Sequence, residues 1–94
     1  MVKEELLIGN KPLHSYVMAC VTKFQQSNEE LHMVTLKARG RAINRAVDVA
    51  EIITKKFLVG KIKIKDIRIH TEELTLEDNK KNKVSAMEID LIRS

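Results

Sequence analysis

One apolar stripe between residues 13 and 24 constrains the fold of this chain most strongly. Its six members recur at the spacing of one helix face, namely Leu13, Tyr16, Val17, Cys20, Val21 and Phe24. Polar side chains occupy the other side, and Pro12 suits the first turn of a helix because its missing N–H is not needed there. A helix with one apolar face must bury that face against a second layer, which other segments of the chain have to supply.

Strand-like segments precede and follow this helix. Residues 4–8 predict a short strand. Residues 30–38 carry apolar side chains at both parities, which is typical of a central strand that is buried on both faces over part of its length. Residues 62–74 and 84–93 alternate between apolar and polar side chains and enclose a polar tip at 77–83, so they predict a long hairpin.

The first strand of this hairpin slips in phase. Ile62 and Ile64 share one parity, whereas Ile67 and Ile69 share the other. A strand with a period of two residues cannot keep both pairs on one face without an extra residue. We therefore expect a bulge or bend at residues 65–66.

A second helix is expected over residues 41–58, where the pattern stops just before a glycine. Its predicted core stripe comprises Ile43, Ala46, Val47, Ala50, Ile53 and Phe57. Val49 and Ile52 widen the apolar arc beyond what one sheet needs. The extra width indicates a second packing partner, for which another subunit is one candidate.

These segments give the order β-α-β-α-β-β. We expect the α/β class, as an α+β two-layer sandwich with two helices on one face of a four-stranded mixed sheet and a long hairpin arm. The 94 residues suit a single domain, residues 1–94. The chain contains neither an apolar run of about 18 residues nor a secretory signal, so we expect a cytoplasmic protein that does not contact membranes.

The net charge of +4 is distributed unevenly. Two segments, residues 37–45 and 79–83, contain no acid, and their basic residues are Lys37, Arg39, Arg41, Arg45, Lys80, Lys81 and Lys83. The other 10 basic residues are outnumbered by 13 acids, so the positive excess is predicted to lie in these two segments. Such clustering is typical of a polyanion-binding surface. The plain alternative is a solvated loop and helix start.

The run Arg39-Gly40-Arg41 lies where a strand ends and a helix begins. Free backbone N–H groups and the helix dipole favour an anion at such a junction, and the glycine lets the backbone approach a phosphate closely. Asn10 and Lys11 lie at the corresponding junction of the first strand and helix. In a parallel βαβ unit both junctions meet at the same sheet edge, so we expect Lys11 to lie near the two arginines.

Arg45 extends this positive face by one helical turn, and the hairpin lysines are expected to reach outward from it. Aromatic residues are scarce, so bases have few rings to stack on. Phosphate contacts should dominate, which gives affinity with little sequence selectivity.

Candidates for catalysis and metal binding are weak. His14, His32 and His70 lack a second metal ligand at a helical or hairpin spacing. Cys20 lies on the apolar stripe without a histidine placed to activate it, which favours a buried small hydrophobe. We expect no enzyme, no metal site, no cofactor and no small-molecule substrate.

Five blocks of the chain together form a specific pattern, namely residues 8–12 (Ile-Gly-Asn-Lys-Pro), Tyr16-Val17, residues 37–43 (Lys-Ala-Arg-Gly-Arg-Ala-Ile), the block from Ala46 to Phe57 and residues 84–89. In these blocks the chain resembles the Alba family of archaeal DNA- and RNA-binding chromosomal proteins. The resemblance covers nearly the whole chain without large gaps.

The resemblance implies compact homodimers with a basic body and hairpin arms that extend along the duplex. Such proteins coat, bridge or stiffen DNA and also bind RNA, with little sequence preference. Lys11, Arg39 and Arg41 would then be body contacts. Phe57 would mediate contacts between neighbouring dimers on nucleic acid, whereas the helical stripe places Phe57 in the core.

One departure from the family concerns a modification. Asn10 stands where many members have the first of two lysines, so acetylation of that lysine does not carry over to position 10. Whether Lys11 is acetylated instead is an open alternative.

The leading hypothesis is a homodimer that binds double-stranded DNA and RNA and compacts chromosomal DNA in the nucleoid. Its predicted contact residues are Asn10, Lys11, Lys37, Arg39, Gly40, Arg41, Arg45, Lys80, Lys81 and Lys83. One alternative is an RNA-binding protein of RNA processing or translation with little role in chromosome packaging. Another is a protein–protein adaptor that uses the broad apolar face of the second helix.

Overall fold

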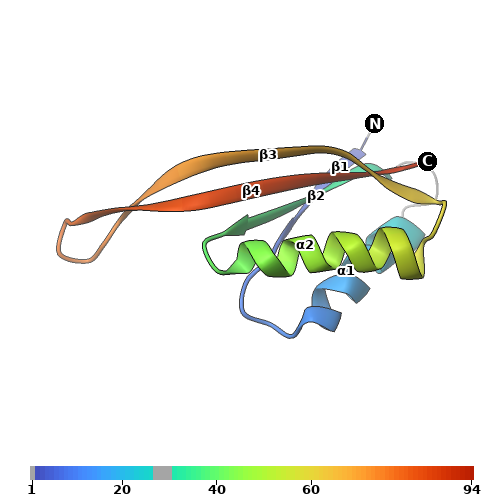
Figure 1. The fold of residues 1–94 in the computed structure, drawn as a ribbon, viewed down its shortest axis with the longest axis horizontal. Coiled ribbons are helices and arrows are strands. Elements are labelled where there is room, and N and C mark those ends of the chain that lie inside the picture. The colour runs from blue at the N-terminus through green and yellow to red at the C-terminus, as the bar shows by residue number, and fades with distance from the viewer. Residues whose placement is uncertain (1, 27–30) are drawn as a thin grey trace.

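The computed structural model describes residues 2–26 and 31–94, which form a sheet with helices against one side of it (Figure 1). In chain order the elements are β1 (Val2–Leu7), α1 (Leu13–Gln26), β2 (Leu31–Arg39), α2 (Ala42–Ile52), the π-helical turn η1 (Ile53–Phe57), β3 (Ile62–Thr75) and β4 (Lys81–Arg93). The predicted strand start at Glu30 lies outside the described residues. None of the helices in these two ranges is long and apolar enough to cross a membrane.

The four strands form one mixed sheet in the order β1-β2-β4-β3. β1 and β2 run parallel, whereas β4 is antiparallel to both β2 and β3. Figure 1 shows α1 and α2 on the same side of this sheet, so the predicted two-layer fold is confirmed. Because β1 and β2 are parallel, the loops that lead from them into α1 and α2 emerge at the same sheet edge.

The core confirms the predicted stripe of α1. This helix buries Tyr16, Val17, Cys20, Val21 and Phe24 against the sheet, with Leu13 partly buried beside them. β2 is an inner strand, and its consecutive residues 33–36 are all buried, as the apolar side chains at both parities predicted. Val34 and Leu36 belong to the core under the helices, while Met33 and Thr35 face the other side of the sheet.

α2 buries part of the predicted stripe: Ala46, Ala50 and Ile53 are confirmed as core residues and Ile43 is partly buried against them. Its buried side chains, with that of the next residue in η1, are Ala46, Val49, Ala50 and Ile53. Val47 is 39% exposed and Phe57 is 56% exposed, so the predicted core positions of these two residues are wrong. Val49 is fully buried in the core of its own chain rather than left for a second partner.

The π-helical turn η1 explains why Phe57 leaves the core. The N–H of Leu58 donates to the carbonyl of Ile53 at 2.8 Å, which is an i→i+5 bond. An α-helix advances about 100° per residue, so one extra residue in the turn rotates the following side chains by about that angle. A stripe that contains Ile53 would reach Phe57 in a regular α-helix, and the wider turn directs Phe57 outward instead.

β3 contains the predicted bulge, because its register against β4 shifts between Ile64 and Asp66. Ile64, Ile67 and Ile69 consequently lie on one face, opposite alternate residues of β4. They remain 41%, 50% and 75% exposed, since β3 is an edge strand and the β3–β4 hairpin projects beyond the helices (Figure 1). The resulting molecule measures 46 × 27 × 20 Å.

The sheet face opposite the helices carries a polar network around the buried carboxylate of Asp90. The Thr35 hydroxyl donates to Asp90 Oδ1 at 2.7 Å, and Arg68 donates to both Asp90 oxygens at 2.6 and 2.9 Å. Arg68 also pairs with Asp66 and Glu88, each at 3.0 Å. The hydrogen bond from Arg68 is the main cause that holds the pKa of Asp90 below its usual value. The network therefore ties β2, β4 and β3 together next to the bulge.

Candidate nucleic-acid interface

The loop between β1 and α1 is wrapped around one buried hydroxyl. Tyr16 Oη accepts hydrogen bonds from the N–H groups of Gly9 at 2.9 Å and Lys11 at 3.0 Å. A Cβ at position 9 would lie 3.4 Å from this oxygen, at the limit of ordinary van der Waals contact. Arg45 Nη1, from α2, donates to the Gly9 carbonyl at 2.7 Å. The loop that carries Lys11 is thus fixed to both α1 and α2.

The loop between β2 and α2 turns at Gly40. This residue has a φ of +54°, a backbone conformation that side chains disfavour. Its N–H donates to the Ser85 carbonyl of β4 at 2.8 Å, and its carbonyl accepts from Ile43 N at 3.1 Å. Gly40 therefore anchors the turn that separates Arg39, on the sheet, from Arg41, at the start of the helix.

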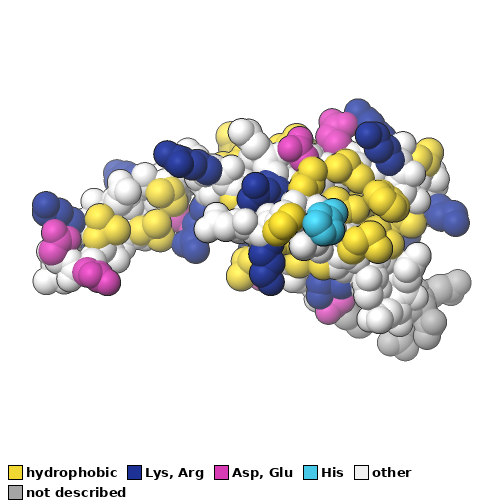
Figure 2. All heavy atoms as spheres, turned by 90° about the horizontal axis from the view of Figure 1, so that it is seen from below, with side chains coloured by type: hydrophobic (Ala, Val, Ile, Leu, Met, Phe, Trp, Pro, Cys, Tyr) yellow, Lys and Arg dark blue, Asp and Glu magenta, His cyan; other side chains and the backbone are white. Residues whose placement is uncertain are grey.

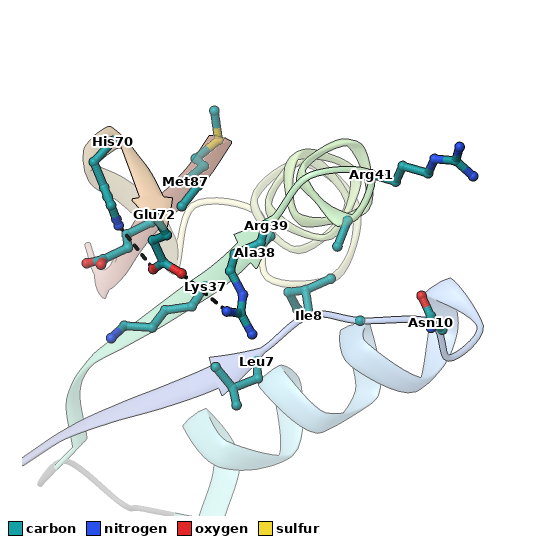
Figure 3. Close-up of a pocket in the computed structure, with 14 residues that line it drawn as sticks. Leu7, Ile8, Asn10, Lys37, Ala38, Arg39, Arg41, His70, Glu72 and Met87 are labelled. Carbon is teal, nitrogen blue, oxygen red and sulfur yellow. Dashed lines mark hydrogen bonds and ion pairs between the residues drawn. The ribbon is translucent and has the colours of Figure 1, made fainter. Parts of the chain in front are cut away.

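An open pocket of about 580 Å³ lies where these loops meet the base of the hairpin. Its lining includes four predicted contact residues, Asn10, Lys37, Arg39 and Arg41, which the fold brings together from both loops. The other side is lined by hairpin residues, including His70, Glu72 and Glu88. Figure 3 shows Arg39 directed toward Glu72, whereas Arg41 extends from the start of α2 away from it.

Carboxylates from other strands partner the cations at the end of β2. Lys37 pairs with Glu5 of β1 at 3.2 Å, and Arg39 pairs with Glu72 of β3 at 3.3 Å. Glu72 also contacts His70 Nε2 at 3.2 Å through its other oxygen. The segment of residues 37–45 is acid-free in the sequence, but strand pairing places acids beside two of its cations.

Lys11 and Arg41 differ from Lys37 and Arg39, which are ion-paired. Both are exposed, and neither has an ion-pair partner among residues 2–26 and 31–94. No acid lies in the first turn of α1 or α2, and no side chain caps α2. The positive ends of both helix dipoles are therefore left without a protein anion, which favours an external one. Lys11 does not itself line the described pocket but follows Asn10 in the same loop.

The hairpin arm is less basic than its tip suggests. Lys81 pairs with Glu73 at 3.3 Å and Lys80 pairs with Asp78 at 3.6 Å, while Lys83 lies directly opposite Glu73 in the β3–β4 register. Residues 72–83 contain four acids and three lysines, which gives a net charge of −1. The arm lysines must therefore compete with their own carboxylates for any phosphate.

A third acid-free segment was missed by the sequence prediction. Residues 52–65 contain no acid and five lysines, namely Lys55, Lys56, Lys61, Lys63 and Lys65. The prediction that the positive excess lies in only two segments is therefore wrong. Counting charges over windows of 14 residues would have found this segment, because its lysines are spread over a helix end, a turn and a strand.

The structure offers little for catalysis. Cys20 is fully buried, and burial raises the pKa of its thiol to about 12, which keeps it protonated and unreactive. No cluster of three or more metal-ligating side chains occurs in the described parts of the chain.

The fold and the site define a small two-layer α/β protein with cationic loops at one sheet edge and a protruding hairpin. Residues 4–71 match the family model described as Alba. The chain is 47% identical over 93 residues to DNA/RNA-binding protein Alba 1 from Archaeoglobus fulgidus, which covers 99% of both chains. It is 49% identical over 88 residues to DNA/RNA-binding protein Alba from Methanocella arvoryzae, covering 94% of this chain and 88% of the relative. The chain belongs to the Alba family, as its sequence predicted.

Solved structures agree with this assignment. Alba from Thermoplasma volcanium is 40% identical and superposes with a TM-score of 0.83 over 95% of this chain and 99% of that one. ALBA1 from Trypanosoma brucei is 23% identical, with a TM-score of 0.63 over 96% of this chain and 68% of that one. The second match supports the fold alone.

Proposed function

We propose that this protein is a non-enzymatic, sequence-tolerant binder of double-stranded DNA and RNA that acts by neutralising phosphates. The observation that carries the proposal is the placement of Lys11 and Arg41, exposed and without carboxylate partners in the described chain, at the acid-free starts of α1 and α2. Arginine binds phosphate with two parallel hydrogen bonds, and lysine acts as a point charge. The archaeal relatives are named DNA/RNA-binding proteins, which supports the same partner.

The other predicted contacts take graded roles in this proposal. Lys37 and Arg39 reach phosphate by exchanging Glu5 and Glu72 for it. Arg45 mainly holds the first loop through its bond to the Gly9 carbonyl. Asn10 and Gly40 lie in the two loops, where the backbone can approach a phosphate closely. Lys80, Lys81 and Lys83 contribute point charges from the arm.

The proposal includes a homodimer. Ile64, Ile67 and Ile69 form an exposed apolar row on the helix side of β3. Water contact with such a row is unfavourable, and a second copy would bury it. Phe57, half exposed at the end of η1, is the proposed contact between neighbouring dimers on nucleic acid.

In the cell, such dimers would coat and compact chromosomal DNA in the nucleoid. Each bound dimer replaces condensed counterions along the duplex without reading base edges, so binding can continue from one site to the next. Acetylation of Lys11 would remove one of the two unpaired body charges and would weaken this binding.

The test is quantitative binding of duplex DNA, single-stranded DNA and RNA at 50 and 200 mM salt. A dimer with about 6–10 phosphate contacts should lose about 10³–10⁵-fold in affinity across this range. The double variant Lys11→Gln/Arg41→Gln should weaken binding of every sequence to the same extent. The charge-matched control is Lys3→Gln/Lys23→Gln, which removes two lysines at the start of β1 and near the end of α1, away from the two loops, and should weaken binding less. An affinity that does not change with salt would contradict the proposal.

The alternative of an RNA-binding protein of RNA processing or translation uses the same cations. It predicts that structured RNA displaces a bound duplex at equal phosphate concentration, while the duplex fails to displace the RNA. A protein–protein adaptor predicts no polyanion affinity in either direction.

A further inference from the structure

Five lysines gather at the end of the molecule that is farthest from the arm. Lys55 and Lys56 lie in η1, Lys61 lies in the turn that follows, and Lys63 and Lys65 lie at the start of β3. Figure 1 shows the end of the second helix and the start of β3 side by side, opposite the hairpin tip. All five side chains are exposed. Ile62 is buried under the helices, so Lys63 points to the opposite face of the sheet, and the set extends around this end of the molecule from the helical layer to that face. We name this set the distal lysine surface.

Part of this charge has a local counterpart. Lys55 pairs with Glu51 one turn earlier at 2.7 Å, and Lys56 lines the same hollow as Asp48 and Glu51. Lys65 acts electrostatically on Asp90, whose carboxylate is bound by Arg68. Lys56, Lys61, Lys63 and Lys65 nevertheless have no ion-pair partner within 4 Å in the described ranges. In Figure 2, Lys and Arg side chains appear at the body end of the molecule as well as along the arm. The charge pattern therefore continues well beyond the two loops of the body.

Two structural roles explain part of this surface. A cation in the last helical turn complements the negative end of the helix dipole, and Lys55 is sufficient for that role. Lysines on an edge strand discourage pairing with other sheets, which suits Lys63 and Lys65 on β3. Neither role needs all five charges within 11 residues, where they repel one another in the absence of an anion.

We propose that the distal lysine surface is a second binding surface for the phosphate backbone of nucleic acid. This inference rests on the proposed function. The 11 residues of α2 and the 5 of η1, at about 1.5 Å each, separate Arg41 from the distal lysines by roughly 24 Å. That distance is about twice the width of a major groove, so the two surfaces do not grip neighbouring phosphates. The distal surface holds either a further stretch of the same duplex or a second duplex.

The test uses the full chain with Lys56→Gln, Lys61→Gln and Lys63→Gln combined, and two controls. The first control replaces the same three residues by arginine, which keeps the charge. The second compares Lys63→Gln alone with Lys3→Gln alone, because both are exposed lysines on edge strands. Unfolding curves of all variants should superpose on that of the unsubstituted chain, since the side chains are exposed.

Two readouts distinguish the sources of phosphate. If the same duplex continues over the surface, the salt slope of log K on a long duplex should fall by about three in the triple glutamine variant. If a second duplex is held, capture of a labelled duplex by bead-bound complexes should drop at least tenfold while affinity for the first duplex is retained. The arginine variant should behave like the unsubstituted chain in both assays.

An unchanged slope together with unchanged capture in the glutamine variant would overturn this inference and leave the proposed function intact. Absence of salt-dependent binding in the unsubstituted chain would overturn both. An equal loss from Lys3→Gln and Lys63→Gln would also overturn it, because net charge alone would then explain the effect.

Discussion

Glu72 divides its two carboxylate oxygens between Arg39, at 3.3 Å, and His70, at 3.2 Å. This carboxylate occupies a donor on Arg39 Nη1 and offsets part of the guanidinium charge, so it competes with a phosphate for Arg39. We predict that Glu72→Gln tightens binding of duplex DNA by up to about fivefold, because an exposed ion pair is worth about 0.2–1 kcal/mol. Titrations at one fixed salt concentration measure the change. Glu4→Gln, which removes a charge that pairs with Lys23 instead, should change affinity less.

Asp90 gives the fold a dependence on acid. Its pKa is depressed, so the stabilisation it supplies is complete above its ordinary value of 3.8 and is lost as the pH falls through the lower folded value. We predict that the free energy of unfolding decreases below about pH 4 and that Asp90→Asn flattens this decrease. At pH 7 the variant should be less stable by about 2 kcal/mol, because a buried hydrogen-bonded charge is lost. Urea unfolding at pH 3 and pH 7 tests both statements, and equal pH dependence in the two proteins would contradict them.

At the scale of elements, the sequence predicts a regular α-helix better than one that ends in a π-helical turn. The stripe of α1 has a single period from Leu13 to Phe24, and five of its six residues are buried. In α2, apolar residues occupy more than one face, so periodicity could not decide whether Val47 or Val49 points inward. The π-helical turn at η1 depends on tertiary packing and leaves no signal in the order of residue types, which is why Phe57 was misplaced.

The candidate site shows the same division between local and long-range information. The strand–helix junctions and their cations follow from local patterns, and the parallel pairing of β1 and β2 brings them together. The carboxylate partners Glu5 and Glu72 come from strands that are distant in sequence from Lys37 and Arg39. An acid-free window along the chain therefore does not establish an acid-free surface.

The exposure of Phe57 gives a prediction for η1. Phe57→Ala should change the free energy of unfolding by less than about 1 kcal/mol, because the side chain is 56% exposed. Phe24→Ala, in the core, should cost about 3–5 kcal/mol. If Phe57 joins neighbouring dimers, its variant should also bind long duplexes with reduced cooperativity and short ones normally. Calorimetry and binding isotherms on duplexes of two lengths separate these effects, and a large loss of stability would return Phe57 to the core.

At the scale of the whole molecule, the proposed dimer would link association of the chains to nucleic-acid affinity through the number of phosphate contacts. Ile67 and Ile69 are 50% and 75% exposed, so Ile67→Glu/Ile69→Glu should leave the fold of the single chain intact. Two carboxylates in a shared apolar interface would each lose hydration without a partner, which should prevent association. We predict a monomer by light scattering. Leu7→Glu, at 72% exposed on the other side of the sheet, should remain dimeric.

The monomer should then bind nucleic acid with about half the salt slope of the dimer, because each duplex meets one set of Lys11 and Arg41 rather than two. The monomer should also bind more weakly at low salt, because it lacks the phosphate contacts that Lys11 and Arg41 of the second chain would make. A monomeric variant that keeps the full slope would show that one chain makes all of the contacts and that the apolar row on β3 serves a different purpose. A variant that remains dimeric would place the interface elsewhere on the chain.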